Sequence, residues 1–491
     1  MNARRFAFSV LALLALPVAV SAQSHDASVA NHELHLYAAA DFGINPATVT
    51  YSRDIAPILE RSCVSCHRAG GGAPMSLRSY DEVRPMARRI RNRTAIRDRM
   101  GAMPPWFVEK DIGIHSAFKD DYSLSSEELA KIQAWADNGA PEGNRADMPA
   151  PRDFADSGAW TIGTPDLVLR SVDKTMPPVG PDRWGDIGLV PTGLTEDRYV
   201  MAVEVREVND IPAENESSTV GGRYVFHHMT YTSGVLSEDG TEVVGQRTSW
   251  PIHEVGRNAD VFPDKAGRLL RAGSALHLGA SHLHANGRET IGHLEFGFKF
   301  FPPDYEPEYM NRGPRLGNGV DIDVAPNKAN QEFHSYQVLQ QHTKIVAFEP
   351  HLHAPGVRMC MEAIWGHNQF TLSCVGYSHN WVKQYVFEDD AAPLLPKGTI
   401  LHVIGFLDTT EGNPNVADSR NWAGGGRRSV SNMFIDLGYS VTLTEEQFQA
   451  EMAARRAMMK DRNDYDVGCP LCWAPVVTDM EEGPTGGREN Q

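Results

Sequence analysis

The sequence predicts a multidomain protein with one small all-α domain followed by two all-β sandwich domains. Two observations carry this prediction. Residues 51–145 place apolar residues at helical spacing, whereas residues 166–443 consist of short β-branched and aromatic runs separated by Gly, Pro, Asn and Asp. The chain has 491 residues, of which 41% are hydrophobic and 22% charged. This length and composition fit several globular domains and exclude a disordered or fibrous protein.

The first residues have the pattern of an export signal. Two arginines precede an apolar run, Phe6–Val20, which is too short to cross a membrane comfortably. Small residues precede Gln23, so residues 1–22 are a predicted signal peptide and residues 23–50 a leader. No other stretch reaches transmembrane length, so we expect a periplasmic or secreted protein without a stable membrane anchor.

The helical signals lie in residues 51–145. Ile55, Ile58 and Leu59 have helical spacing, and the pattern returns at Ser125–Ala136, where Ser126 can cap a helix. The segment 146–165, rich in Pro, Asp and Gly, is the predicted linker.

The β-rich part divides into a first domain, residues 166–325, and a second, residues 326–443. The boundary follows the Gly, Pro and Asn content of residues 311–330. The remaining segment, residues 444–491, is predicted to be a helix and a C-terminal tail, because Thr444-Glu445-Glu446-Gln447 is typical of a capping box.

A C-x-x-C-H motif, Cys63-Val64-Ser65-Cys66-His67, predicts one covalently bound haem c in the helical domain. Two thiols one helical turn apart can hold the vinyl groups, and the adjacent histidine can ligate iron. Met103, before Pro104-Pro105, is the predicted second axial ligand, and Met75 and Met100 are the competing candidates. The segment 52–106 resembles bacterial cytochrome c-like modules fused to other exported domains. That resemblance also implies Met103 as the ligand.

The net charge of the chain is −17, which disfavours nucleic acid as a partner.

Histidines gather at three places in the β-rich part. Imidazole is the commonest metal ligand among side chains. Residues i and i+2 of a strand share a face, so either His-x-His pair can bind one metal. Adjacent histidines could do so only at a bulge or through different ring nitrogens. The three groups are His227-His228-Met229, His277 with His282 and His284, and His351-Leu352-His353.

All-imidazole sites with an optional thioether suit copper, although zinc remains open from ligand type alone. The order His-His-Met, His, His-x-His and Met resembles the copper type II, ascorbate-dependent monooxygenases, the family of peptidylglycine α-hydroxylating monooxygenase and dopamine β-monooxygenase. Over residues 165–443, the resemblance implies two jelly-roll-like sandwiches with one copper each and a solvent-filled cleft between them. The implied electron-transfer ligands are His227, His228 and His284, with His282 or His277 as alternatives to the third. The implied oxygen-binding and catalytic ligands are His351, His353 and Met433.

The resemblance implies a copper-dependent monooxygenase that hydroxylates a C–H bond of a small molecule with O2. Electrons would come from an ascorbate-like reductant or a redox protein. We expect them to pass through the haem to the first copper and then to the second. The alternatives are a periplasmic haem and copper electron-transfer or copper-binding protein without oxygenase activity, and a protein-binding sandwich with structural histidines.

The chain departs from the peptide-hydroxylating members at two positions. Glu349 stands where they use an arginine to grip a carboxylate, and Leu437 stands where a tyrosine is expected. A peptide ending in glycine is therefore not the expected substrate. Glu349 could meet a cation or hydroxyl, or be an exposed structural carboxylate.

The other four cysteines form two pairs. Cys360 and Cys374 flank a turn symmetrically, which predicts a cross-strand disulfide. Cys469 and Cys472 lack a following histidine, and a local structural disulfide is favoured over a redox or metal site.

Overall fold

The chain is mainly β-sheet, with 37% of residues in strands and 16% in helices. The computed structural model describes residues 34–69, 71–73, 75–114, 117–152, 154, 159–212, 222–254, 259–312, 316–426 and 431–462. The predicted signal peptide, its cleavage point and the Cys469–Cys472 pair lie outside these residues.

The N-terminal part of the described chain is helical. Ser125, not Ser126, caps α4, because its hydroxyl accepts from the Glu128 N–H while the Glu128 carboxylate accepts from the Ser125 N–H. The helices enclose their own apolar core, in which Leu129 and Trp135 are fully buried. The helices are α1(Ala56–Ser62), α2(Tyr80–Val83), α3(Ala87–Ala95) and α4(Ser126–Asp137), with short 3-10 or π turns η2(Ala39–Phe42), η3(Pro46–Thr48), η4(Tyr51–Ile55), η5(Arg84–Met86) and η6(Arg145–Asp147).

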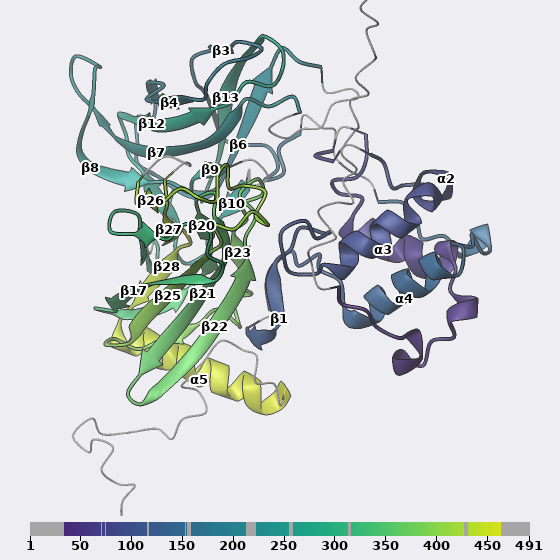
Figure 1. The fold of residues 1–491 in the computed structure, drawn as a ribbon. Coiled ribbons are helices and arrows are strands. Elements are labelled where there is room, and N and C mark those ends of the chain that lie inside the picture. The colour runs from purple at the N-terminus through teal and green to yellow at the C-terminus, as the bar shows by residue number, and fades with distance from the viewer. Residues whose placement is uncertain are drawn as a thin grey trace, which may run out of the picture.

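The all-α prediction for residues 51–145 is only partly right. Residues Val108–Gly113 form a strand, β1, which leaves the helices and pairs with β22(Asn368–Gly376) in the β-rich part (Figure 1). Trp106 and Phe107, just before β1, are buried in the apolar core of that second part. Residues 106–113 therefore attach the helical segment to the β-rich part.

Two six-stranded antiparallel sheets form the first sandwich. They pack face to face, with Tyr231 of one sheet against Phe296 of the other, ring centres 5.2 Å apart. One sheet contains β2(Leu167–Arg170), β3(Lys174–Met176), β6(Arg198–Asn209), β10(Ala259–Val261), β11(Arg268–Leu270) and β13(Thr290–Phe300). The other contains β4(Arg183–Gly185), β5(Leu189–Pro191), β7(Phe226–Leu236), β8(Val243–Ser249), β9(His253–Glu254) and β12(Ser274–Leu283).

The second sandwich is built around a five-stranded sheet in the order β1-β22-β21-β25-β17. Its other strands are β17(Gln331–Val338), β21(Gly356–Trp365) and β25(Ile400–Leu407). Smaller sheets face it and comprise β14(Met310–Arg312), β18(His342–Ile345), β24(Leu394–Leu395) and β28(Ser440–Leu443); β15(Leu316–Asn318), β20(Pro350–Leu352) and β27(Phe434–Asp436); β16(Asp323–Val324) with β26(Ala423–Gly424); and β19(Ala347–Phe348) with β23(Tyr385–Val386). The strands at 310–324, expected in the first domain, thus pair with strands beyond residue 420.

A terminal helix and a disulfide complete the fold. Helix α5(Glu445–Arg462) begins at the predicted capping box, since Gln447 N–H donates to the Thr444 hydroxyl and Thr444 N–H to the Gln447 side chain. The predicted Cys360–Cys374 disulfide is present between β21 and β22, where the two residues are direct partners. None of the helices in the described residues is long and apolar enough to cross a membrane.

Candidate metal centre at the junction of the two sandwiches

A bulge in β7 brings the adjacent histidines to one side. The ladder pairs His282 with His228 and then Leu283 with Phe226, so His227 is the extra residue. Such a bulge removes the alternation that would send neighbours to opposite faces. The Nδ1 atoms of His227 and His228 lie 3.1 Å apart. The bulge is one of the two arrangements predicted from the sequence for these neighbours to share a metal.

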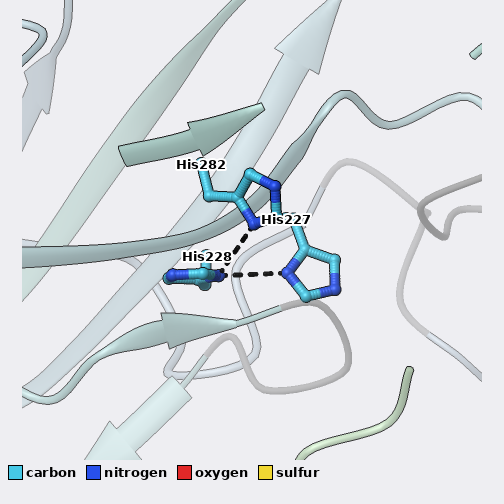
Figure 2. A group of neighbouring side chains, drawn as sticks. All are labelled: His227, His228 and His282. Atoms are coloured by element: carbon cyan, nitrogen blue, oxygen red, sulfur yellow. Dashed lines mark hydrogen bonds between the residues drawn. The ribbon is translucent and has the colours of Figure 1, made fainter. Parts of the chain in front are cut away.

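His282 joins this pair from β12. Its Nδ1 lies 3.3 Å from Nδ1 of His228, and Figure 2 shows the three rings converging. The nitrogen atoms of His227, His228 and His282 lie within 4.8 Å of one another, close enough to hold one metal ion. Trp184 stacks on the His282 ring at 3.5 Å and fixes its plane.

His284 is the predicted third ligand, and its nitrogen is available for a metal. Asp182 accepts from His284 Nδ1 at 2.9 Å and from His282 Nε2 at 2.9 Å. The His284 Nε2 is buried without a hydrogen-bond partner, and the His284 and His227 rings lie 4.9 Å apart. A carboxylate that holds one ring nitrogen and frees the other is typical of metal-ligating histidines. The structure thus brings both His282 and His284 to His227.

His277, the remaining alternative, does not reach this group. Its Nε2 forms an ion pair with Asp186 at 2.6 Å on the partly exposed surface. His277 also lies outside the groups of histidines whose nitrogens converge.

The second predicted set lies on β20 and beside β27. His351 Nδ1 lies 3.1 Å from Glu254, and His353 Nδ1 lies 2.9 Å from the Ser431 carbonyl. Both bonds leave Nε2 as the free nitrogen, and the two rings are 5.6 Å apart. Met433 is adjacent, because its carbonyl accepts from His353 N–H, and its side chain packs over Gly319.

Burial favours the neutral form of His227, His228, His282 and His353. Desolvation, followed by the neighbouring histidines, lowers the pKa of His227 to about 2 and lowers that of His228 well below its usual value. Desolvation also lowers the pKa of His282 to about 4 and of His353 to about 3. Neutral imidazole is the form that binds a metal, so near pH 7 no proton needs to leave.

Sequence reasoning missed two residues that lie between the two sets. Glu254 stands opposite His228 in the ladder and bonds to His351. His379, from a turn of the second sandwich, has its ring 5.8 Å from that of His227. Neither belongs to a repeated pattern, so the sequence carries no signal for them. The two sets are linked through these side chains.

Glu349 is fully buried, so the expectation of an exposed structural carboxylate is wrong. Its Oε2 accepts from the Gln384 amide at 3.2 Å, and its N–H donates to the Asp436 carboxylate. These bonds place it inside the second sandwich, two residues from His351.

The haem motif lies at the end of α1. His67 is buried, and its Nδ1 is 3.2 Å from the Met75 carbonyl, which leaves Nε2 for a ligand. Cys63 and Cys66 are unpaired thiols. Met75 thus supports His67 through its backbone, while the Met103 side chain is 42% exposed.

Two hollows lie in the helical segment, and Cys63, Cys66 and His67 line neither of them. One of about 730 Å³ is lined by Arg61 and Leu124 among others, and a smaller one is lined by Met103 and Trp106. They share Arg97, Lys110, Ser123 and Leu124. The donor set of C-x-x-C-H, with a free His67 nitrogen, fits a covalent haem.

Comparisons with known proteins add little. No protein-family model matches the sequence, and no curated protein matches it. Among solved structures, the chain is similar to the structure of infectious bursal disease virus Gx strain. That match covers 61% of this chain and 77% of that chain at 11% identity, with a TM-score of 0.18. A score this low carries no argument about fold or function.

Proposed function

We propose that the protein is an exported copper-dependent monooxygenase that hydroxylates a C–H bond of a small molecule with O2. One observation carries the proposal. Two sets of histidines, with ring nitrogens bonded to Asp182, Glu254 and the Ser431 carbonyl, meet at the junction of two sandwiches. We also propose that the two sandwiches have jelly-roll-like topology, that the helical segment is a cytochrome c-like domain, and that the protein is periplasmic or secreted.

His227, His228, His282 and His284 would hold one copper, and His351, His353 and Met433 the other. Copper at these sets would supply one-electron chemistry toward O2. The protein's own contribution is orientation: Asp182, Glu254 and the Ser431 carbonyl each hold one nitrogen of a ligand ring and leave the other nitrogen free.

The helical segment would supply the electrons through haem at Cys63, Cys66 and His67, with Met103 as the candidate axial ligand. Its docking supports this role. The Phe107 carbonyl accepts from Gly376 N–H at 2.9 Å, only three residues before His379. The external donor would be an ascorbate-like reductant or a redox protein.

Metal analysis with oxygen measurements tests the proposal. We expect two coppers per chain, a c-type haem spectrum, and oxygen consumption stimulated by a member of a small-molecule C–H panel. Met433→Ala should abolish that stimulation and leave the haem spectrum intact. Met310→Ala, at a methionine that is 61% exposed, is the matched control.

Other outcomes separate the alternatives. Copper without substrate-stimulated oxygen consumption would favour an electron-transfer or copper-binding protein. A chain that binds no metal would make the histidines structural. Normal turnover in the Met433→Ala variant would refute the assignment of the second set.

A further inference from the structure

We infer that His379, from the second sandwich, is a ligand of the metal ion held by His227 and His284 of the first sandwich, so that one ion ties the two sandwiches together. The inference rests on the proposed function only for the identity of the ion as copper. It concerns a residue outside both ligand sets that the sequence indicates.

Two unpartnered nitrogens point to the ion. His284 gives its Nδ1 to Asp182, and its Nε2 is buried without a hydrogen-bond partner. His379 likewise buries an Nδ1 without a hydrogen-bond partner. A buried polar atom without a partner costs about 1–3 kcal/mol, so a ligand at each of these nitrogens would lower that cost.

The ring separations suit coordination to one ion. Imidazole nitrogen binds such metals at about 2.0–2.1 Å, so two ligand rings have centres roughly 4.5–6.5 Å apart. The His227 ring lies 4.9 Å from the His284 ring and 5.8 Å from the His379 ring. Both values fall inside that range.

The turn that carries His379 is anchored to the second sandwich. Tyr377 is buried, its N–H donates to the Val357 carbonyl, and its hydroxyl donates to the carbonyl of Leu352, which lies between His351 and His353. Trp381 N–H closes the turn on the Ser378 carbonyl. His379 therefore has a fixed base from which to reach across.

The contact across the junction is reciprocal. Glu254 of the first sandwich orients His351 of the second, and His379 of the second faces His227 of the first. The sandwiches are held in register nearby, because the Tyr439 hydroxyl donates to the Val261 carbonyl and its ring packs on Phe262. Each candidate centre is thus completed by its neighbour.

Hydrogen exchange of the full-length chain tests the inference without altering His379. In a His353→Ala background, which disables the second set, Cu(I) should bind only at the first set. We expect it to slow backbone amide exchange at residues 377–380 by about tenfold or more, because ligation suppresses local opening of that turn. The hairpin turn at exposed His367 should not change. Equal exchange at 377–380 with and without Cu(I) would overturn the inference.

A variant provides the second measurement. In the same background, His379→Ala should weaken Cu(I) binding by about tenfold or more in competition with a chromophoric chelator, because one ligand is lost. The His367→Ala control should bind like its parent. Unchanged affinity in a folded His379→Ala variant would also overturn the inference.

These outcomes are separable from those of the proposed function. Copper-dependent protection of residues 377–380 in a chain without substrate-stimulated oxygen consumption would support His379 as a shared ligand and contradict the monooxygenase proposal. Substrate-stimulated oxygen consumption without protection of residues 377–380 would support the monooxygenase and contradict the shared ligand.

Discussion

For each histidine of the candidate centre, the partner of one ring nitrogen decides what the other nitrogen can do. Asp182 spans two rings, with 2.9 Å bonds to both His282 and His284. The shared carboxylate fixes their tautomers and their spacing. Several of the other histidines, such as His342 with Glu445 and His402 with Glu362, pair with carboxylates outside the centre. A carboxylate partner alone therefore does not indicate that a histidine is a metal ligand. The indication is that the unbonded ring nitrogens of several histidines lie close together.

We predict that Asp182→Asn weakens copper binding at the first set by about 10–100-fold, because it removes the charge that orients both rings. Copper titration followed by competition with a chelator measures the effect. Asp186→Asn is the matched control, since Asp186 pairs with His277 on the same strand but outside the set. An Asp182→Asn chain that binds two coppers as tightly as the parent would contradict this role.

The sequence could predict the ligand residues only in part. Spacing alone predicted His351 and His353 as a pair, and it predicted that His227 and His228 share a metal only at a bulge or through different ring nitrogens. It could not decide between His282 and His284, because the answer depends on Asp182, which lies far upstream in the chain. Glu254 and His379 were not predicted at all, since their contacts are made across two sandwiches.

At the scale of elements, local signals succeeded and nonlocal pairing failed. Residues close in sequence form the capping boxes of α4 and α5 and the Cys360–Cys374 hairpin. All three features could therefore be predicted from the sequence, although the predicted cap of α4 was displaced by one residue. β1 was missed, because a strand of six residues in a helical segment becomes a strand only when it pairs with distant β22. The same reason accounts for the short strands at 310–324.

The turn after β15 offers an element-scale test of the second set. A Cβ added at Gly319 would lie 2.6 Å from Cε of Met433, so Gly319→Ala should displace this flexible side chain with little loss of stability. We expect weaker Cu(I) binding at the second set and an unchanged first set, measured by chelator competition. Gly412→Ala, whose Cβ would have only the Thr410 hydroxyl 3.5 Å away, is the control. Full Cu(I) affinity in Gly319→Ala would show that Met433 is not a ligand.

At the scale of the whole molecule, two of the apolar cores join different parts of the chain. The core of the first sandwich extends through Tyr439 to α5, where Phe448 and Met452 are buried, and a second core takes in Trp106 of the helical segment. The histidine sets lie where the two sandwiches join. Closing this junction removes imidazoles from water, and that desolvation makes the stability of the metal-free chain depend on pH.

We predict that the metal-free chain loses stability as the pH falls below about 6.5, the pKa of histidine in an unfolded chain. The folded-state pKa values of His282 and His353 are about 4 and about 3. Between these values and 6.5 the unfolded chain binds protons that the folded chain does not, so acid favours unfolding. The slope approaches about 1.4 kcal/mol per pH unit for each such histidine. Burial raises the pKa values of Glu207 and Asp436 to about 7. These two groups oppose the trend, because their contribution to the stability of the folded chain falls as the pH rises toward 7.

Urea unfolding of the metal-free chain at pH 7, 6 and 5 measures this dependence. The buried histidines with lowered pKa values outnumber the three carboxyls with raised pKa values, Asp98, Glu207 and Asp436, so the free energy of unfolding should fall from pH 7 to pH 5. His353→Gln should flatten the profile, because glutamine takes up no proton in either state, whereas His367→Ala should leave it unchanged, since His367 is exposed. A parent profile that is flat or rises toward pH 5 would mean that the imidazoles of the junction are not held neutral by burial, and the centre would then bind metal in competition with protons near neutral pH.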